Sequence, residues 1–460
     1  MNDTGPATFL AVAVGILLMP LLAVVSPELK DAFTADVMVG IDLGTTFSVV
    51  ATCTKKNVTV QSIDGRETMP SVVYFNASSV PNWREAPVIP DKAVAVGLHA
   101  HALKAQHPRN VIYGAKRLIG LDYDDPVVQL ERAALQYVVG KDEEGYAVPV
   151  VQGRMISPEE VGTFLLRRMK TVAQDAGSVL RRVFGFKFKS VTVSVPVSFS
   201  HDQKAATIRA ANKAGFTFVR VIEEPIAAAI AYGLDDHEGD RKVVVFDFGG
   251  GTLDVALLRL DPEQGAFLVM DRAGDPHLGG EDFDTAIAQH FKARLQGLTG
   301  ASEEAMAQVY PAILQASEAA KRALSEHEVV QLDTAGMRTE HPALEIPDLQ
   351  LSRADLEAIC ADLLDRARAP LAQALRQMNL AASDIDDVVM VGGSSRLTAV
   401  RNLVQALPRC KCSAPFKSLA GHAAMDVCSP DVVHDCRDST LMPLPVPLRR
   451  RSASFLAEFD

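Results

Sequence analysis

The sequence contains the same local design twice. VGIDLGTTFSVV runs from Val39 to Val50, and VVFDFGGGTLDVALL runs from Val244 to Leu258. In each, an apolar strand leads into an aspartate, a turn of small residues follows, and a second β-rich run continues, which is the pattern of a β-hairpin. Two ordinary hairpins would not each require an aspartate before the turn. The repeat therefore predicts two related lobes whose hairpins face each other across a cleft.

The two turns suit a polyphosphate, because glycine lets the backbone approach a ligand closely and successive N–H groups supply donors to its oxygens. The residues of the turns are Gly44, Thr45 and Thr46 in the first, and Gly249, Gly250, Gly251 and Thr252 in the second. We expect Asp42 and Asp247 to hold Mg²⁺ through its water ligands, since this ion dehydrates reluctantly. Asp254 either joins them or terminates its hairpin, and the sequence favours neither interpretation.

The rest of the chain alternates strands and helices, which indicates an α/β protein. Helices are expected at 157–176, 201–214, 225–232, 302–326 and 352–378, and after about residue 397; strands are expected at 190–196, 218–222 and 387–393. We place the first lobe at 36–235 and the second at 236–407.

Composition limits the possible functions. A chain of 460 residues with 48% hydrophobic content can bury a large core and divide into two or more domains. The formal net charge of −11 excludes a general nucleic-acid binder, whose binding surface would be basic.

The two ends differ from the middle. Ala7 to Val25 carries no charge and is nearly as long as a membrane-spanning helix, so residues 1–35 are predicted to be a signal peptide or signal anchor. Any membrane contact is expected through this segment only; a buried core helix is the alternative. Residues 408–460 are rich in proline and hold four cysteines, and we expect them to be poorly ordered. A zinc site there is disfavoured, because the spacing matches no paired C-x-x-C framework.

Six motifs, in order, resemble the nucleotide-binding domain of the seventy-kilodalton heat-shock chaperones, from about Val37 to Leu407. They are DLGTT, AKRLIG at Ala115–Gly120, EEPIAAAIAYG at Glu223–Gly233, DFGGGTLD, GDPHLGGEDFD at Gly274–Asp284 and VGGSSR at Val391–Arg396. The resemblance implies the two-lobed actin-like and hexokinase-like ATPase fold, with ATP or ADP and Mg²⁺ bound between the lobes.

The resemblance also implies individual roles. Lys116 corresponds to the essential lysine near the γ-phosphate. Glu224 corresponds to the acid that orients water, and Thr252 to the hydroxyl that positions it. With Asp42 and Asp247 these residues form the expected catalytic set, which acts by positioning and charge neutralisation. Lys204 stands where the family has an arginine that relays interlobe signals, so the charge is kept and the guanidinium fork is lost.

The adenosine is expected to bind on one helix face. Glu318, Lys321, Arg322 and Ser325 are spaced at i, i+3, i+4 and i+7, which brings them to the same side of a helix. By resemblance this face contacts ribose and base. The remaining expected nucleotide contacts are Gly279, Gly280, Gly392, Gly393, Ser394 and Arg396.

Two departures from the family's pattern shape the functional prediction. The family's closing strand and helix, and its peptide-binding domain, have no counterpart after Leu407 in this sequence. The layout resembles a microsomal branch of the family, which implies an ATPase in the endoplasmic reticulum lumen that assists protein folding, has no peptide-client site and is read by a co-chaperone or regulatory partner. Two alternatives stay open: a nucleotide-binding module that does not hydrolyse ATP, and a small-molecule kinase of the same superfamily.

Overall fold

The computed structural model describes residues 38–53, 58–104, 106–176, 188–234, 239–261 and 266–405. The predicted leader and the predicted Cys/Pro-rich tail lie outside these residues. Within them, no helix is both long enough and apolar enough to cross a membrane.

Lobe I is built on a mixed sheet with the strand order β12-β11-β1-β2-β3. Its strands are β1 (Met38–Leu43), β2 (Phe47–Cys53), β3 (Val58–Val60), β11 (Ser190–Val195) and β12 (Phe218–Glu223), and the short β4 (Met69–Pro70) pairs with β2. β1 and β2 form the predicted antiparallel hairpin, and β11 joins β1 in parallel. Alternate residues of β1, including Val39 and Ile41, enter the core of this lobe.

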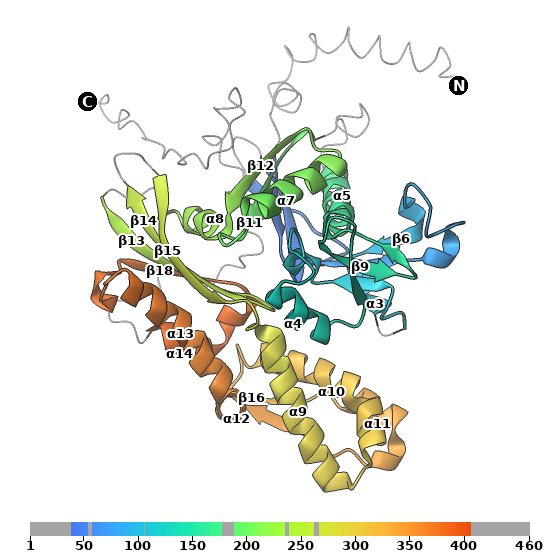
Figure 1. The fold of residues 1–460 in the computed structure, drawn as a ribbon. Helices are drawn as coiled ribbons and strands as arrows, with labels where there is room; N and C mark the ends of the chain where they lie inside the picture. The colour runs from blue at the N-terminus through green and yellow to red at the C-terminus, as the bar shows by residue number, and fades with distance from the viewer. Residues whose placement is uncertain are drawn as a thin grey trace, which may run out of the picture.

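Smaller elements extend lobe I. Two three-stranded sheets consist of β5 (Val72–Phe75), β6 (Val94–Val96) and β7 (Val111–Tyr113), and of β8 (Val138–Lys141), β9 (Ala147–Val151) and β10 (Arg154–Met155). The helices are α3 (Leu98–Ala102), α4 (Pro126–Ala134), α5 (Pro158–Ala176) and α7 (His201–Lys213), with the 3₁₀ turn η3 at Ala115–Arg117. α5 packs on β1 and β2 and against α7, so it covers one face of the main sheet (Figure 1).

Lobe II repeats this design. Its sheet has the order β15-β14-β13-β18, formed by β13 (Arg241–Phe248), β14 (Leu253–Asp261), β15 (Ala266–Asp275) and β18 (Asp387–Val391). β13 and β14 form the second predicted hairpin, and β18 joins β13 in parallel as β11 joins β1. Both hairpins match the two-lobed prediction, and the structure adds a parallel strand beside each.

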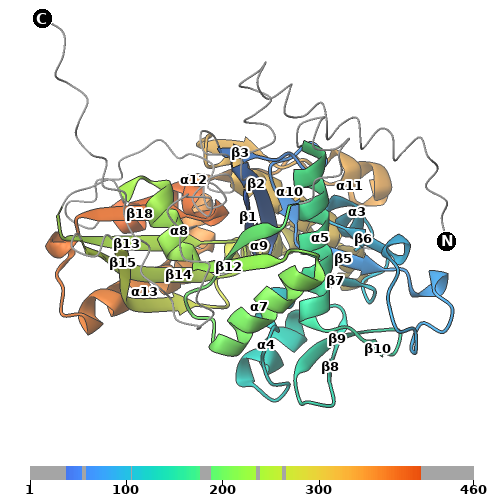
Figure 2. The ribbon, with the colours of Figure 1, turned by 90° about the horizontal axis from the view of Figure 1, so that it is seen from above.

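Helix α8 (Glu224–Ala231) connects the lobes. It continues directly from β12 of lobe I, and its alanines share a buried cluster with Val243 and Val245 of β13 and with Val389 of β18. In the view from above, the lobe II strands lie on the left with α8 over them, α5 and α7 of lobe I lie further right, and β12 lies between (Figure 2). The helix is thus attached to one lobe and packed on the other.

The outer part of lobe II is mostly helical. It contains α9 (Gly280–Thr299), α10 (Glu303–Ala323), α11 (Ala335–Glu340), α12 (Arg353–Ile359), α13 (Ala361–Gln377) and α14 (Thr398–Gln405), with β16 (Val329–Gln331) paired to β17 (Gln350–Ser352). α13 packs on β14 and β15, on the face opposite α8 (Figure 1).

Two helix predictions were wrong in extent. The predicted helix 352–378 is two helices, because Cys360 has non-helical torsions (φ −102°, ψ 19°) and lets the chain turn between α12 and α13. The predicted helix 302–326 ends at Ala323. Ser352 and Ser302 cap their helices, so both starting points were predicted correctly.

Candidate nucleotide site

The turns of the two hairpins meet. A Cβ atom built on Gly250 of the second turn would lie 2.8 Å from Oγ1 of Thr46 in the first. The Thr46 hydroxyl also donates a hydrogen bond of 3.2 Å to Glu281 Oε1 in α9 of lobe II. The hairpins therefore converge across the interlobe boundary, as the sequence repeat predicted.

The first turn needs its glycine for a local reason. A Cβ on Gly44 would lie 2.1 Å from the carbonyl oxygen of Phe47, so the turn closes only without a side chain there. Ser71 secures the turn by donating a 2.7 Å hydrogen bond to the Gly44 carbonyl. A cavity behind the turn is lined by Gly44, Thr45, Lys116 and Ser194 and lies inside lobe I.

The second turn rests on the N-terminus of α9. The backbone N–H of Gly280 donates to the Gly249 carbonyl (3.1 Å), and that of Glu281 donates to the Gly250 carbonyl (2.8 Å). A Cβ on Gly279 would lie 2.3 Å from the Gly250 carbonyl oxygen. The glycines of the GDPHLGGEDFD motif thus allow backbone to pack directly on backbone.

Buried carboxylates surround the meeting point. Burial, the charge of Glu224, and then Asp254 and Asp42 raise the pKa of Asp247 well above its usual value. Burial and Glu224 likewise raise the pKa of Asp42, which accepts a 2.7 Å hydrogen bond from the Ser194 hydroxyl. The same causes raise the pKa of Asp254 to about 6. Asp42 and Asp247 are therefore close enough to repel, and Asp254, left open by the sequence, belongs to the same group.

Lys116 supplies the positive charge. Lys116 lies in η3, which begins directly after Gly114. The φ of Gly114 is +64°, a left-handed conformation that glycine adopts easily. Lys116 Nζ donates to Glu224 Oε1 at 2.7 Å, although the two residues are 108 positions apart. The neighbouring Glu223 pairs with Lys204 at 2.8 Å, so both acids at the start of α8 are paired with lysines of lobe I.

The chemistry of this set of acidic side chains fits a magnesium ion. Four acids, Asp42, Asp247, Asp254 and Glu224, interact with one another, and Lys116 is the cation that acts on all three aspartates. Hard oxygen donors with excess negative charge are what Mg²⁺ prefers. Across the described part of the chain, no three His, Cys, Asp or Glu side chains are arranged to hold a metal by themselves. Water and phosphate would have to supply part of the coordination.

Several predicted adenosine-side residues gather beyond the second turn. The Ser394 hydroxyl donates to the Gly249 carbonyl at 2.7 Å. Lys321 is buried and donates to the Gly280 carbonyl (2.7 Å) and to Asp284 Oδ2 (2.8 Å). Burial raises the pKa of Asp284 to about 6, and Lys321 opposes that rise. Gly392 reaches the same place, since its Cβ would lie 2.7 Å from Asp247 Oδ1.

The other members of that set lie differently. Arg322 is exposed and Glu318 is half-buried, and they form an i,i+4 pair of 3.6 Å on α10. Ser325 lies beyond the end of the helix at Ala323, so the prediction that all four residues share one helix was wrong for this residue. Gly393 and Arg396 lie in the 3₁₀ turn Gly393–Arg396 that follows β18.

Sequence reasoning missed partners that lie far away along the chain. Ser194, Glu281 and Asp284 contact predicted site residues but were not themselves predicted as site residues. Glu281 and Asp284 belong to a quoted motif, whereas Ser194 would have required knowledge that β11 pairs with β1 at Asp42.

A family model described as Hsp70 protein matches residues 38–418. The heat shock protein hsp-6 of Caenorhabditis elegans is 34% identical to this chain over 371 residues. That match covers 80% of this chain and 53% of the relative, so the chain spans about half the length of the curated relative it matches.

Proposed function

Because this chain belongs to the Hsp70 family, we propose that it binds ATP with Mg²⁺ between its two lobes and hydrolyses it. Members of this family are chaperones and ATPases. The observation that carries the proposal is the convergence of two glycine turns, one from each lobe, on a group of buried acids beside one lysine.

Each part of the site has a chemical task in this reaction. The turn glycines would admit the phosphates, with backbone N–H groups and the Thr45 hydroxyl as donors to them. The hydroxyls of Thr46 and Thr252, which contact Glu281 and Asp254 here, would have to turn towards the phosphates. Lys116 would stabilise negative charge that develops on the transferred phosphoryl group, and Glu224 would orient the attacking water. A bound Mg²⁺, held by Asp42 and Asp247 through water, would neutralise phosphate charge.

Lobe closure links hydrolysis to a partner. α8 begins at Glu224 in the site and is packed on the lobe II sheet, so the nucleotide bound at Glu224 would influence how the lobes are placed. We propose that a co-chaperone or regulatory protein responds to that placement, in support of protein folding.

The test uses the full chain with ATP and Mg²⁺. We expect nucleotide binding by calorimetry and phosphate release that stops when EDTA is added. Gly250→Ala should weaken binding by about tenfold or more, because its methyl would collide with Thr46 at the interlobe contact. Gly336→Ala, which meets open space, is the matched control. Binding without phosphate release would favour a non-hydrolysing module, and no binding would contradict the proposal.

The place of action is a separate proposal. The uncharged run from Ala7 to Val25 supports entry into the secretory pathway, with residence in the endoplasmic reticulum lumen. Protease protection of the full chain, translated in the presence of microsomes, tests it: protected chain agrees, and chain degraded without detergent contradicts it.

A further inference from the structure

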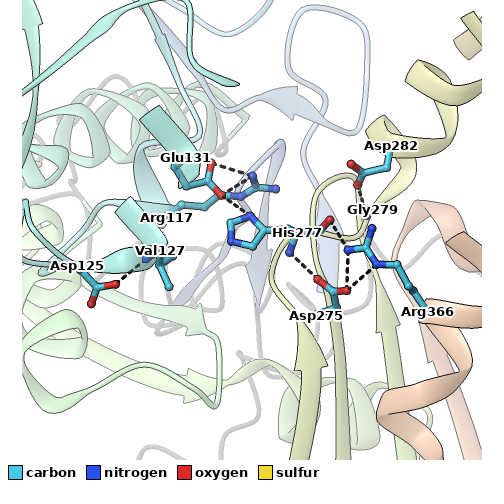
Figure 3. Close-up of polar contacts among 9 residues, drawn as sticks. All are labelled: Arg117, Asp125, Val127, Glu131, Asp275, His277, Gly279, Asp282 and Arg366. Atoms are coloured by element: carbon cyan, nitrogen blue, oxygen red, sulfur yellow. Dashed lines mark hydrogen bonds and ion pairs between the residues drawn. The ribbon is translucent and has the colours of Figure 1, made fainter. Parts of the chain in front are cut away.

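A buried acid contacts residues of both lobes at a point outside the two glycine turns. Glu131, on α4 of lobe I, is only 5% exposed. It accepts two hydrogen bonds from Arg117 Nη1, of 2.9 and 3.0 Å, and its Oε1 lies 3.1 Å from His277 Nδ1 of lobe II. We refer to Arg117, Glu131 and His277 as the interlobe clasp (Figure 3).

The lobe II residue of the clasp, His277, is fixed by hydrogen bonds to its backbone. The backbone N–H of His277 donates to Asp275 Oδ1 at 2.9 Å, and its carbonyl accepts from Arg366 Nη2 at 3.1 Å. Arg366, on α13, also forms a 2.7 Å ion pair with Asp275. In Figure 3, His277 lies between Glu131 on one side and this Asp275–Arg366 pair on the other. His277 is therefore tied to β15 through Asp275 and to α13 through Arg366.

In lobe I, the clasp residues Arg117 and Glu131 are linked to the candidate nucleotide site. Arg117 directly follows Lys116, and a Cβ on Gly251 would lie 1.8 Å from Arg117 Nη2. The guanidinium thus lies against the second glycine turn, and Glu131 holds it there because both of its carboxylate oxygens accept hydrogen bonds from Arg117 Nη1. Glu131 consequently constrains the position of η3 in lobe I and of the Gly251 turn in lobe II.

We propose that Glu131 is a positioning residue that keeps the lobes closed around bound nucleotide: through Arg117 it holds η3 against the Gly251 turn, and through His277 it holds lobe II. This inference rests on the proposed function for its effect on nucleotide. The contact Glu131–His277 sets how fast product leaves, and the contact Glu131–Arg117 sets how well the site is aligned for hydrolysis.

The test separates these two effects. In the full chain, His277→Ala should speed the release of a fluorescent ADP by about tenfold or more, since breaking a buried hydrogen-bonded contact acts mainly on dissociation. Hydrolysis of already bound ATP in a single turnover should change by less than about twofold. Glu131→Gln should speed release and also slow hydrolysis. The double variant should release ADP no faster than Glu131→Gln alone, because both changes break the same contact.

The control is Glu159→Gln. Glu159 is also an ion-paired acid of lobe I, but its partners Arg209 and Lys213 lie within the same lobe, so release should not change. A merely structural role for Glu131 would lower the stability of its variant without this split between release and hydrolysis. Additive effects of the two substitutions, or unchanged release, would overturn the proposal.

A second measurement does not require nucleotide. Amide hydrogen exchange of the apo chain should rise at both the Gly249–Thr252 turn and the His277–Gly279 segment in Glu131→Gln, and at neither in Glu159→Gln. If Glu131→Gln raises exchange at both segments but the wild-type chain binds no ATP, the clasp stands and the proposed function fails. If it binds ATP and neither exchange nor release responds, the clasp fails and the function stands.

Discussion

Lys116 Nζ and Glu224 Oε1 lie 2.7 Å apart, so a single ion pair joins η3 to the first residue of the connecting helix α8. Both side chains are largely shielded from water. The pair places the lysine charge beside the three aspartates and fixes the start of the helix that reaches lobe II.

Lys116→Ala is expected to lower single-turnover hydrolysis by about 100-fold or more, because one positioned donor to developing charge is worth that much. ATP binding should remain measurable, since the glycine turns and the adenosine side are unchanged. Phosphate release and calorimetric binding check the two halves separately. Lys141→Ala removes an exposed ion pair with Asp124 and should leave both unchanged.

Asp254 predicts a pH dependence of the apo protein. Burial and Glu224 raise its pKa to about 6, so the folded chain binds this proton more tightly than the unfolded chain. Its contribution to the free energy of unfolding is full below pH about 4 and is lost as the pH rises through about 6, with a total of up to about 3 kcal/mol.

Asp254→Asn should therefore flatten the stability profile between these pH values and make the apo protein more stable at pH 7. Denaturant titrations across that range measure it, with the exposed Asp365→Asn as control. An Asp254→Asn profile as steep as that of the wild type would contradict the assignment.

The buried pair between Lys321 and Asp284 predicts a second stability effect. Lys321→Met should lower the free energy of unfolding by about 3 kcal/mol or more, because it leaves the buried Asp284 of lobe II without its cation. Adding Asp284→Leu should recover much of the loss, since a buried ion pair and a well-packed apolar pair are often similar in stability. Chemical denaturation followed by circular dichroism gives both values. A double variant no more stable than the single one would rule this out.

Gly392 predicts a strict steric requirement. Its φ is +83°, and a Cβ would lie 2.3 Å from the Phe248 carbonyl oxygen, so Gly392→Ala must displace backbone of β13. We expect a loss of about 2 kcal/mol or more in the free energy of unfolding, from backbone strain and overpacking together. Gly393→Ala meets open space next to it and should cost much less. Equal losses in the two variants would show that the contact carries no special cost.

The duplicated hairpins were predictable because their signals are local. An apolar strand, an aspartate and a glycine turn specify each hairpin within a few residues, and the helix starts at Ser302 and Ser352 rest on equally local capping. The break at Cys360 was not predictable, because the amphipathic pattern continues across it and only the packing of α12 and α13 shows the turn.

The partners of the site residues were hidden for another reason. Helical spacing placed Lys321 on one helix face, and the family resemblance implied that this face meets the ligand. Its ion pair with Asp284, however, depends on how α9 and α10 pack. Glu131 and His277 belong to no shared pattern, and only the approach of the lobes brings them together. Spacing along one element is written in the sequence, whereas a contact between two elements requires the tertiary structure.

The alanine-rich helix α8 has a consequence for how the molecule unfolds. Its buried face completes a layer with Val243, Val245 and Val389 of the second lobe while its first residue continues a strand of the first. Neither half can melt without uncovering part of the other's interior, so heat should denature both in one cooperative transition rather than in two successive steps.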